Sequence, residues 1–128
     1  MRVAFCMAKI SHFRELRVWR AATDIVVEVY RISSGFPKAE AYGLMSQVRR
    51  AAVSVPSNIA EGHTRATTKK YLNHLAAAQA SLAEVETQLE IASRLGYRNS
   101  TEFTAALERT GSVGKQLHAL RSALAHKI

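Results

Sequence analysis

The sequence predicts an all-α protein whose four helices pack antiparallel, up-down-up-down, as one bundle. The 128-residue chain is 48% hydrophobic but has only two prolines and six glycines, so it can form long helices around a core of its own. Apolar residues recur at helical spacing in four separate stretches. Only short connectors separate these stretches, and long helices joined by short loops pack as antiparallel neighbours.

The first helix is expected from about His12 to Ser33. One apolar stripe contains Leu16, Trp19, Val26, Val29 and Tyr30, and a second stripe contains Val18, Ile25 and Ile32. A helix that is apolar on two sides needs a partner on each side. We therefore expect Val18, Ile25 and Ile32 to contact another copy of the chain. Gly35 and Pro37 follow the helix and end it.

The second helix is expected from about Lys38 to Glu61, ended by Gly62. Its inner row contains Leu44, Val48, Ala51, Val55 and Ile59. Pro56 lies inside this row and lacks the backbone N–H of a helical residue. Because the apolar period continues beyond Pro56, the sequence predicts a kink there and not a break.

The third and fourth helices follow a bundle-like heptad pattern. The third begins at a Thr67 or Thr68 cap, and its seam contains Tyr71, Leu75, Ala78, Leu82, Val85, Leu89 and Ala92. Gly96 is expected to take a left-handed conformation at its end. Asn99 and Glu102 resemble a capping box for the fourth helix, which is expected to reach about Lys127. Gly111 and Gly114 inside it indicate either a close helix approach or a weak position.

Residues 11–128 are predicted to form a single bundle domain, with residues 1–10 as a loose tail and Met7 as an alternative start. The only cysteine is Cys6, so no internal disulfide can form and a cytoplasmic location is expected. No apolar run has the length of a membrane-spanning helix, so no membrane partner is expected.

No catalytic, cofactor-binding or metal-binding residues are predicted. The sequence has no Glu-x-x-His pair, zinc signature, phosphate loop or glycine-rich dinucleotide motif. Glu61 and His63 are near neighbours but lack a third group to orient them. We therefore expect a protein that is not an enzyme, with a ligand carrier or unrecognised enzyme as the last alternative.

The strongest functional signal is charge, because 18 Lys and Arg against 10 Asp and Glu give a net charge of +8. The candidate nucleic-acid-binding residues are Arg14, Arg17, Arg49, Arg50, Arg65, Lys69 and Lys70. Cations at the start of the third helix oppose its dipole, and phosphate groups would compensate for this. Two alternatives stay open: the cations are simply solvated, or Arg49 or Arg50 braces the bundle through Glu61 or Glu40.

Several segments resemble a known family: Phe13–Trp19, Val29–Tyr30, Phe36–Pro37, Tyr42–Gly62, Tyr71, Gln88–Leu89 and Leu95–Tyr97. The chain is similar to bacterial four-helix bundle proteins first noticed in intervening sequences of large-subunit ribosomal RNA genes. The accessory variability determinant of diversity-generating retroelements belongs to the same group. The resemblance is close from about Ser11 to Tyr97 and looser in the last helix.

The resemblance implies an up-down bundle that assembles as a homopentameric ring. The retroelement members bind nucleic acid and a reverse transcriptase, which would be a partner here only if one is encoded nearby. The function predicted is thus a non-enzymatic, basic homo-oligomer that binds RNA or DNA through phosphate contacts as an accessory factor. Such contacts read no bases, so we expect little sequence preference. The alternative is a protein-interaction scaffold ring with no direct nucleic-acid role.

Overall fold

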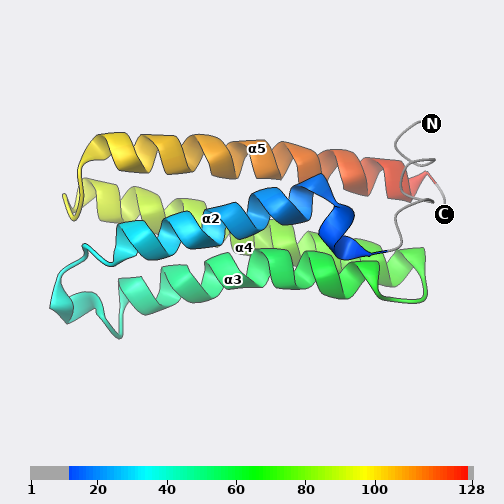
Figure 1. Ribbon diagram of the computed structural model, residues 1–128, viewed down its shortest axis with the longest axis horizontal. Helices are drawn as coiled ribbons and strands as arrows, with labels where there is room; N and C mark the ends of the chain where they lie inside the picture. The colour runs from blue at the N-terminus through cyan, green and yellow to red at the C-terminus, as the bar shows by residue number, and fades with distance from the viewer. Residues whose placement is uncertain (1–11, 127–128) are drawn as a thin grey trace.

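The computed structural model describes residues 12–126, and these residues form a four-helix bundle that contains no strand (Figure 1). The helices are α2 (Arg17–Ser33), α3 (Leu44–His63), α4 (Thr68–Arg94) and α5 (Ser100–Ala125). Two short 3₁₀ turns, η1 (Phe13–Glu15) and η2 (Lys38–Glu40), precede α2 and α3. The predicted fold class is confirmed.

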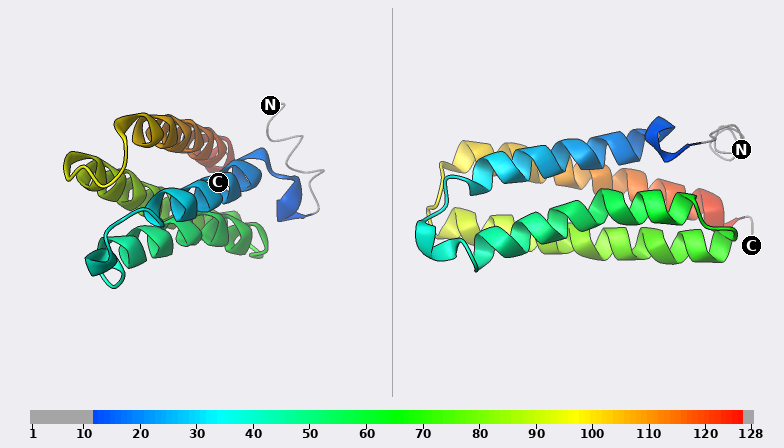
Figure 2. Two further views of the ribbon diagram at one scale, coloured as in Figure 1. Left: turned by 60° about the vertical axis from the view of Figure 1, so that its left-hand side comes forward. Right: turned by 60° about the horizontal axis from the view of Figure 1, so that its bottom comes forward.

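The helices are arranged as a ring of four neighbours. Helix α2 packs on α3, α3 on α4, α4 on α5, and α5 closes the ring on α2 (Figure 2). Consecutive helices run in opposite directions, so α2 and α4 run parallel to each other and both begin at the right-hand end of Figure 1. None of the helices in residues 12–126 is apolar over a length sufficient to cross a membrane.

The core explains the two-sided first helix and corrects one prediction. Val18, Ile25 and Ile32 were predicted to face another subunit, but their exposed fractions are 5%, 3% and 0%. Helix α2 is apolar on two sides because it has two neighbours within its own bundle, α3 and α5. The large apolar side chains of α2 that do face outward are Val27 and Tyr30, which are 70% and 43% exposed.

Both N-terminal helices begin later than the sequence suggested. The backbone is extended at Leu16 (φ −75°, ψ 125°), which separates η1 from α2 and moves the helix start from His12 to Arg17. Residues 38–40 likewise form the separate turn η2, and α3 begins only at Leu44. Helix α3 then continues through Pro56 without a break, as predicted.

Gly62 does not end α3, which continues to His63. A Cβ atom on Gly62 would lie 2.8 Å from His74 Cβ and 2.9 Å from Tyr71 Cδ1, so the glycine allows α4 to approach α3 closely. In α5 a close helix approach was one of two predicted explanations for Gly111 and Gly114, and the two glycines differ. Gly114 lies in ordinary contact range of Leu82 Cδ2, at 3.6 Å from its Cβ position, whereas Gly111 has open space around it.

The remaining helix ends largely confirm the sequence predictions. Thr67 Oγ1 accepts a hydrogen bond from the Lys70 N–H (3.2 Å), and Gly96 has the expected positive φ of 73°. Asn99 Oδ1 accepts from the Glu102 N–H (3.1 Å). The reciprocal half of the capping box is absent in this part of the chain, because the Glu102 carboxylate binds Arg98 instead.

The predictions for the N-terminal tail (residues 1–10, including Cys6 and Met7), Ser11 and the end at Lys127 lie outside the described residues.

Candidate nucleic-acid interface

The up-down topology brings the starts of α2 and α4 to the same end of the bundle (Figure 1). The start of a helix carries partial positive charge and backbone N–H groups without helical partners. Neither helix has an acidic residue in its first turn, and α2 has no side-chain cap. Both first turns instead contain cations, Arg17 and Arg20 in α2 and Lys69 and Lys70 in α4. Positive charge is therefore concentrated at this end.

The opposite end, where α3 and α5 begin, is arranged in the reverse way. Glu40 Oε1 accepts a hydrogen bond from the Leu44 N–H at the start of α3 (3.0 Å), and Tyr97 Oη donates to Glu40 Oε2 (2.6 Å). The Tyr97 and then the Leu44 hydrogen bonds lower the pKa of Glu40 from its ordinary value of 4.5. Glu102 lies in the first turn of α5. Each helix start here thus has a carboxylate that favours it electrostatically.

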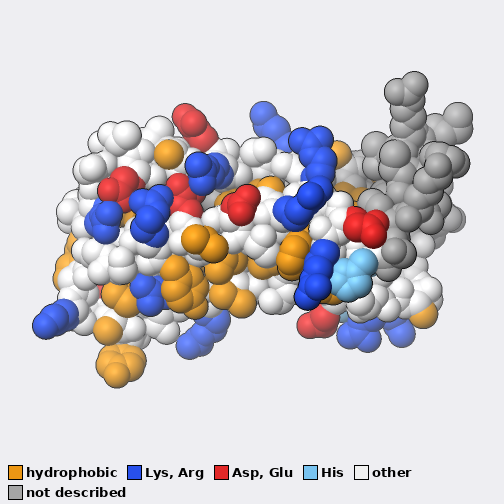
Figure 3. All heavy atoms as spheres, in the orientation of Figure 1, with side chains coloured by type: hydrophobic (Ala, Val, Ile, Leu, Met, Phe, Trp, Pro, Cys, Tyr) orange, Lys and Arg blue, Asp and Glu red, His pale blue; other side chains and the backbone are white. Residues whose placement is uncertain are grey.

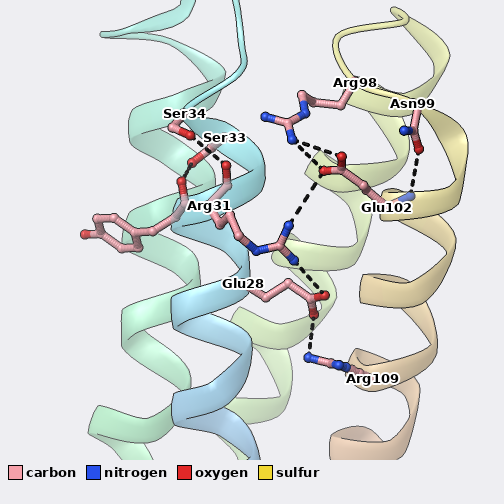
Figure 4. Close-up of polar contacts among 9 residues, drawn as sticks. Glu28, Arg31, Ser33, Ser34, Arg98, Asn99, Glu102 and Arg109 are labelled. Atoms are coloured by element: carbon pink, nitrogen blue, oxygen red, sulfur yellow. Dashed lines mark hydrogen bonds and ion pairs between the residues drawn. The ribbon is translucent and has the colours of Figure 1, made fainter.

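The arginines near that end are already engaged by carboxylates (Figure 4). Arg98 Nη2 lies 2.8 Å from Glu102 Oε2, and Arg31 lies between Glu102 (4.0 Å) and Glu28 (3.5 Å). Arg109 Nη1 is 3.5 Å from Glu28 Oε1 on the same face. This alternation of charges connects α2 with α5 and leaves little net positive charge for an anionic partner.

Five of the seven predicted cations lie at the end where α2 and α4 begin. We call this surface the basic end. It is defined by five exposed residues: Arg14, Arg17, Arg65, Lys69 and Lys70. Arg65 Nη2 is 3.7 Å from Glu61 Oε2, an exposed pair that contributes little energy. Within residues 12–126 the other four side chains make no ion pair or side-chain hydrogen bond. Figure 3 shows Lys and Arg side chains over both the left-hand and the right-hand parts of the visible face, so the two ends differ in the carboxylate partners of their cations.

Arg49 and Arg50 lie elsewhere and have different roles. Arg49 Nε donates to Ser33 Oγ (2.8 Å) and Nη2 to the Tyr30 carbonyl (3.2 Å), with the guanidinium 4.5 Å above the Tyr30 ring. Arg49 therefore braces α3 against the end of α2, where a cation also favours the helix dipole. The bracing alternative was right in kind, but the predicted partners Glu40 and Glu61 were wrong. Arg50 lies in a groove between α3 and α4 and makes no ion pair with another described residue.

A sequence profile described as "23S rRNA-intervening sequence protein" matches residues 14–119, which is most of the chain. The chain belongs to this intervening-sequence protein family. The family description names no reaction, and no enzyme family is indicated.

The fold of this intervening-sequence protein is similar to a crystal structure from Bacteroides thetaiotaomicron of a protein of unknown function in the S23 ribosomal protein family. The similarity has a TM-score of 0.75 at 18% identity and covers 80% of this chain and 96% of the other. At this identity the comparison supports the fold alone. No curated protein matches the sequence significantly.

The segment Tyr42–Gly62, which carried most of the resemblance, forms polar contacts between α3 and α4 in this intervening-sequence protein. Asn58 Nδ2 donates to the Ser54 carbonyl (2.9 Å) and to Ser54 Oγ (3.0 Å), and Asn58 Oδ1 lies 3.2 Å from His74 Nδ1. Asn58 therefore has a structural role between α3 and α4. Within residues 12–126, no group of three or more His, Cys, Asp or Glu side chains is placed to hold a metal ion.

Sequence reasoning missed the feature that organises the site. It identified cations at the start of the third helix but did not connect them with those of the first helix. The signal was available, because in an up-down bundle the first and third helices begin at the same end. The role of Arg49 had no comparable signal, since it depends on a contact across 16 residues with Ser33.

Proposed function

We propose that this protein is a non-enzymatic, basic homo-oligomer that binds nucleic acid through phosphate contacts at its basic end. The observation that carries the proposal is the asymmetry of the bundle. Two helix starts without first-turn acids coincide with exposed cations at one end, whereas the helix starts at the other end are matched by Glu40 and Glu102. Phosphate groups can bind both the cationic side chains and the free N–H groups of a helix start.

Phosphate-led binding predicts little sequence preference and a strong dependence on salt. We would measure fluorescence anisotropy with mixed-sequence RNA and DNA strands while varying the salt concentration. For a single strand, each lost phosphate contact reduces the slope of log K against log salt by about 0.7. The double variant Lys69→Ala/Lys70→Ala should therefore weaken binding and lower the slope by about 1.4.

A matched control removes the same charge away from the basic end. Lys38 in η2 and Lys115 in α5 are both exposed and make no described ion pair. The variant Lys38→Ala/Lys115→Ala should keep most of the affinity and the salt slope of the parent protein. If both double variants lose the same affinity, binding depends on net charge alone and the basic end is not the site. No binding at about 50 mM salt, where phosphate contacts are strong, would refute the function itself.

Self-assembly, with the homopentamer implied by the family resemblance, is part of this proposal. Its support is the set of large apolar side chains exposed on α2 and α3, which are Val27, Tyr30 and Val53. Figure 3 shows apolar side chains in a band across the middle of the visible face. Exposed apolar surface of this kind is typical of protein interfaces. A ring would repeat the basic end on every copy and strengthen weak phosphate contacts by avidity.

Light scattering after size-exclusion chromatography tests the assembly, since the chain mass is 14.1 kDa and a pentamer has five times that mass. Val27→Asp should reduce the mass without loss of helicity, whereas Ala105→Asp, on an exposed position of α5, should not. A parent protein that is monomeric at micromolar concentration would contradict assembly. The same band also supports the scaffold alternative, which nuclease treatment distinguishes: protein partners that survive it favour a scaffold.

A further inference from the structure

Helices α3 and α4 face each other through polar side chains that repeat every seven residues. They are Gln47, Ser54 and Glu61 on α3, and His74, Ser81 and Gln88 on α4. Ser54 Oγ lies 2.8 Å from Ser81 Oγ, and Glu61 Oε2 lies 3.7 Å from His74 Nε2. In this antiparallel register the third pair is Gln47 with Gln88, but these two side chains make no hydrogen bond to each other. Gln88 Oε1 is instead enclosed without a partner among the described residues.

The unbonded pair of Gln47 and Gln88 lies in a groove between α3 and α4, the two helices at the front of the right-hand view in Figure 2. The groove has a volume of about 330 Å³, within the lower range of small-molecule sites. Its lining comprises Gln47, Arg50, Ala51, Ser54, Ser81, Glu84 and Gln88.

Arg50 and Glu84 border this groove from opposite helices without forming an ion pair with each other or with any other residue of the described chain. Arg50 presents a fork of N–H donors, and the Glu84 carboxylate presents two acceptor oxygens. Gln88 Oε1 also lacks a partner, but it is enclosed and is not presented to the groove. A ligand that satisfies Arg50 and Glu84 together must carry paired acceptors on one edge and paired donors on another.

Guanine is the nucleic-acid base with that combination. Its O6 and N7 atoms are the paired acceptors that an arginine fork binds, and its N1–H and N2–H₂ groups are donors that a carboxylate can accept together. Adenine offers a single acceptor, N7, beside its N6–H₂ donor on the same edge, and uracil has no amino group. In a duplex the N1–H of guanine is already paired, so the edge that faces Glu84 is free only in a single strand.

We infer that the α3–α4 groove binds one unpaired guanine, with Arg50 on O6 and N7 and Glu84 on N1–H and N2–H₂. The inference rests on the proposed function, because the guanine belongs to an RNA or DNA strand that the protein binds. Phosphate contacts at the basic end then provide general affinity, and the groove adds a preference for guanine.

The first test uses mononucleotides, which do not depend on the basic end. NMR titrations with GMP, AMP, CMP and UMP would follow the side-chain amide of Gln88 and the backbone amides of Ser81 and Glu84. GMP should bind about tenfold more tightly than AMP, as one good bidentate contact to a base allows. Equal affinity for GMP and AMP, or GMP shifts confined to another surface, would overturn the inference.

The second test compares oligouridine strands that carry either one central guanine or one central adenine. Glu84→Gln should abolish the preference for the guanine strand, because the side chain keeps its size but loses one acceptor. Glu108→Gln makes the same charge change at an exposed position of α5 and should retain the preference. Equal binding of both strands by the parent protein would overturn the guanine site and leave the proposed function standing. Failure of every strand to bind while GMP still occupies the groove would overturn the proposed function alone.

Discussion

The close approach of α3 and α4 at Gly62 can be tested by one substitution made at two glycines. The Cβ atom of Gly62→Ala would lie 2.8 Å from His74 Cβ and 2.9 Å from Tyr71 Cδ1. His74 Cβ is fixed to the α4 backbone, so the clash can be relieved only by separating the helices. Overpacking of this kind costs about 1–3 kcal/mol, against a helix-propensity gain of at most about 1 kcal/mol. We expect Gly62→Ala to lower the free energy of unfolding by about 0.5–2 kcal/mol.

Gly111→Ala provides the matched control, because Gly111 also lies within a helix but has no atom within 4 Å of its Cβ position. Only the propensity gain applies there, so this variant should be about 0.5–1 kcal/mol more stable than the parent protein. Urea denaturation followed by circular dichroism, at one fixed protomer concentration, measures both changes. If Gly62→Ala proves as stable as Gly111→Ala, the close packing of α4 on Gly62 is wrong.

Three further substitutions test the contacts that set stability and its pH dependence. Arg49→Ala should lower the free energy of unfolding by about 1–2 kcal/mol because it removes two charge-assisted hydrogen bonds. Arg50→Ala, the control, should change the free energy of unfolding by less than about 0.5 kcal/mol. Equal effects of the two variants in urea denaturation would contradict the bracing role of Arg49. Tyr71 Oη is enclosed without a hydrogen-bond partner among the described residues, and burial raises its pKa to about 12. The unfolded chain therefore loses this proton first as pH rises above about 10, and stability falls by about 1–2 kcal/mol toward pH 12 after allowance for the partly exposed ring. Tyr71→Phe should abolish that difference and leave stability at pH 7 unchanged or higher, and an equal alkaline loss in both proteins would refute this. Because the pKa of Glu40 is lowered in the folded protein, its contribution to stability is present above pH 4.5 and is lost as the pH falls through the folded-state pKa. Glu40→Gln should therefore flatten the dependence of Tm on pH below pH 4.5. An unchanged dependence of Tm on pH in thermal melts would show that the Tyr97 contact is unimportant.

The periodicity of the sequence was sufficient to predict the class of fold and most helix ends. Apolar spacing is a local property, and so are the caps at Thr67 and Asn99 and the positive φ of Gly96. The predicted starts of α2 and α3 were less accurate than the predicted ends. A 3₁₀ turn precedes each of them, and a 3₁₀ turn has nearly the same apolar spacing as an α-helix.

The candidate site could be predicted only in part. The cations were recognisable from the sequence, and the order of the helices in an up-down bundle places five of them at one end. The groove of Arg50 and Glu84 was not predicted, because it depends on the register between two helices.

By itself, the sequence determined that four amphipathic helices form, where most of them end, and that the chain carries excess positive charge. The tertiary structure alone decided that Val18, Ile25 and Ile32 are buried within one bundle, that Arg49 braces α2, and that Gly62 admits α4. The physical reason is that an apolar stripe specifies how much of a helix is buried but not which helix covers it. Contacts between residues far apart in the chain depend on packing, which is settled only when all the helices come together.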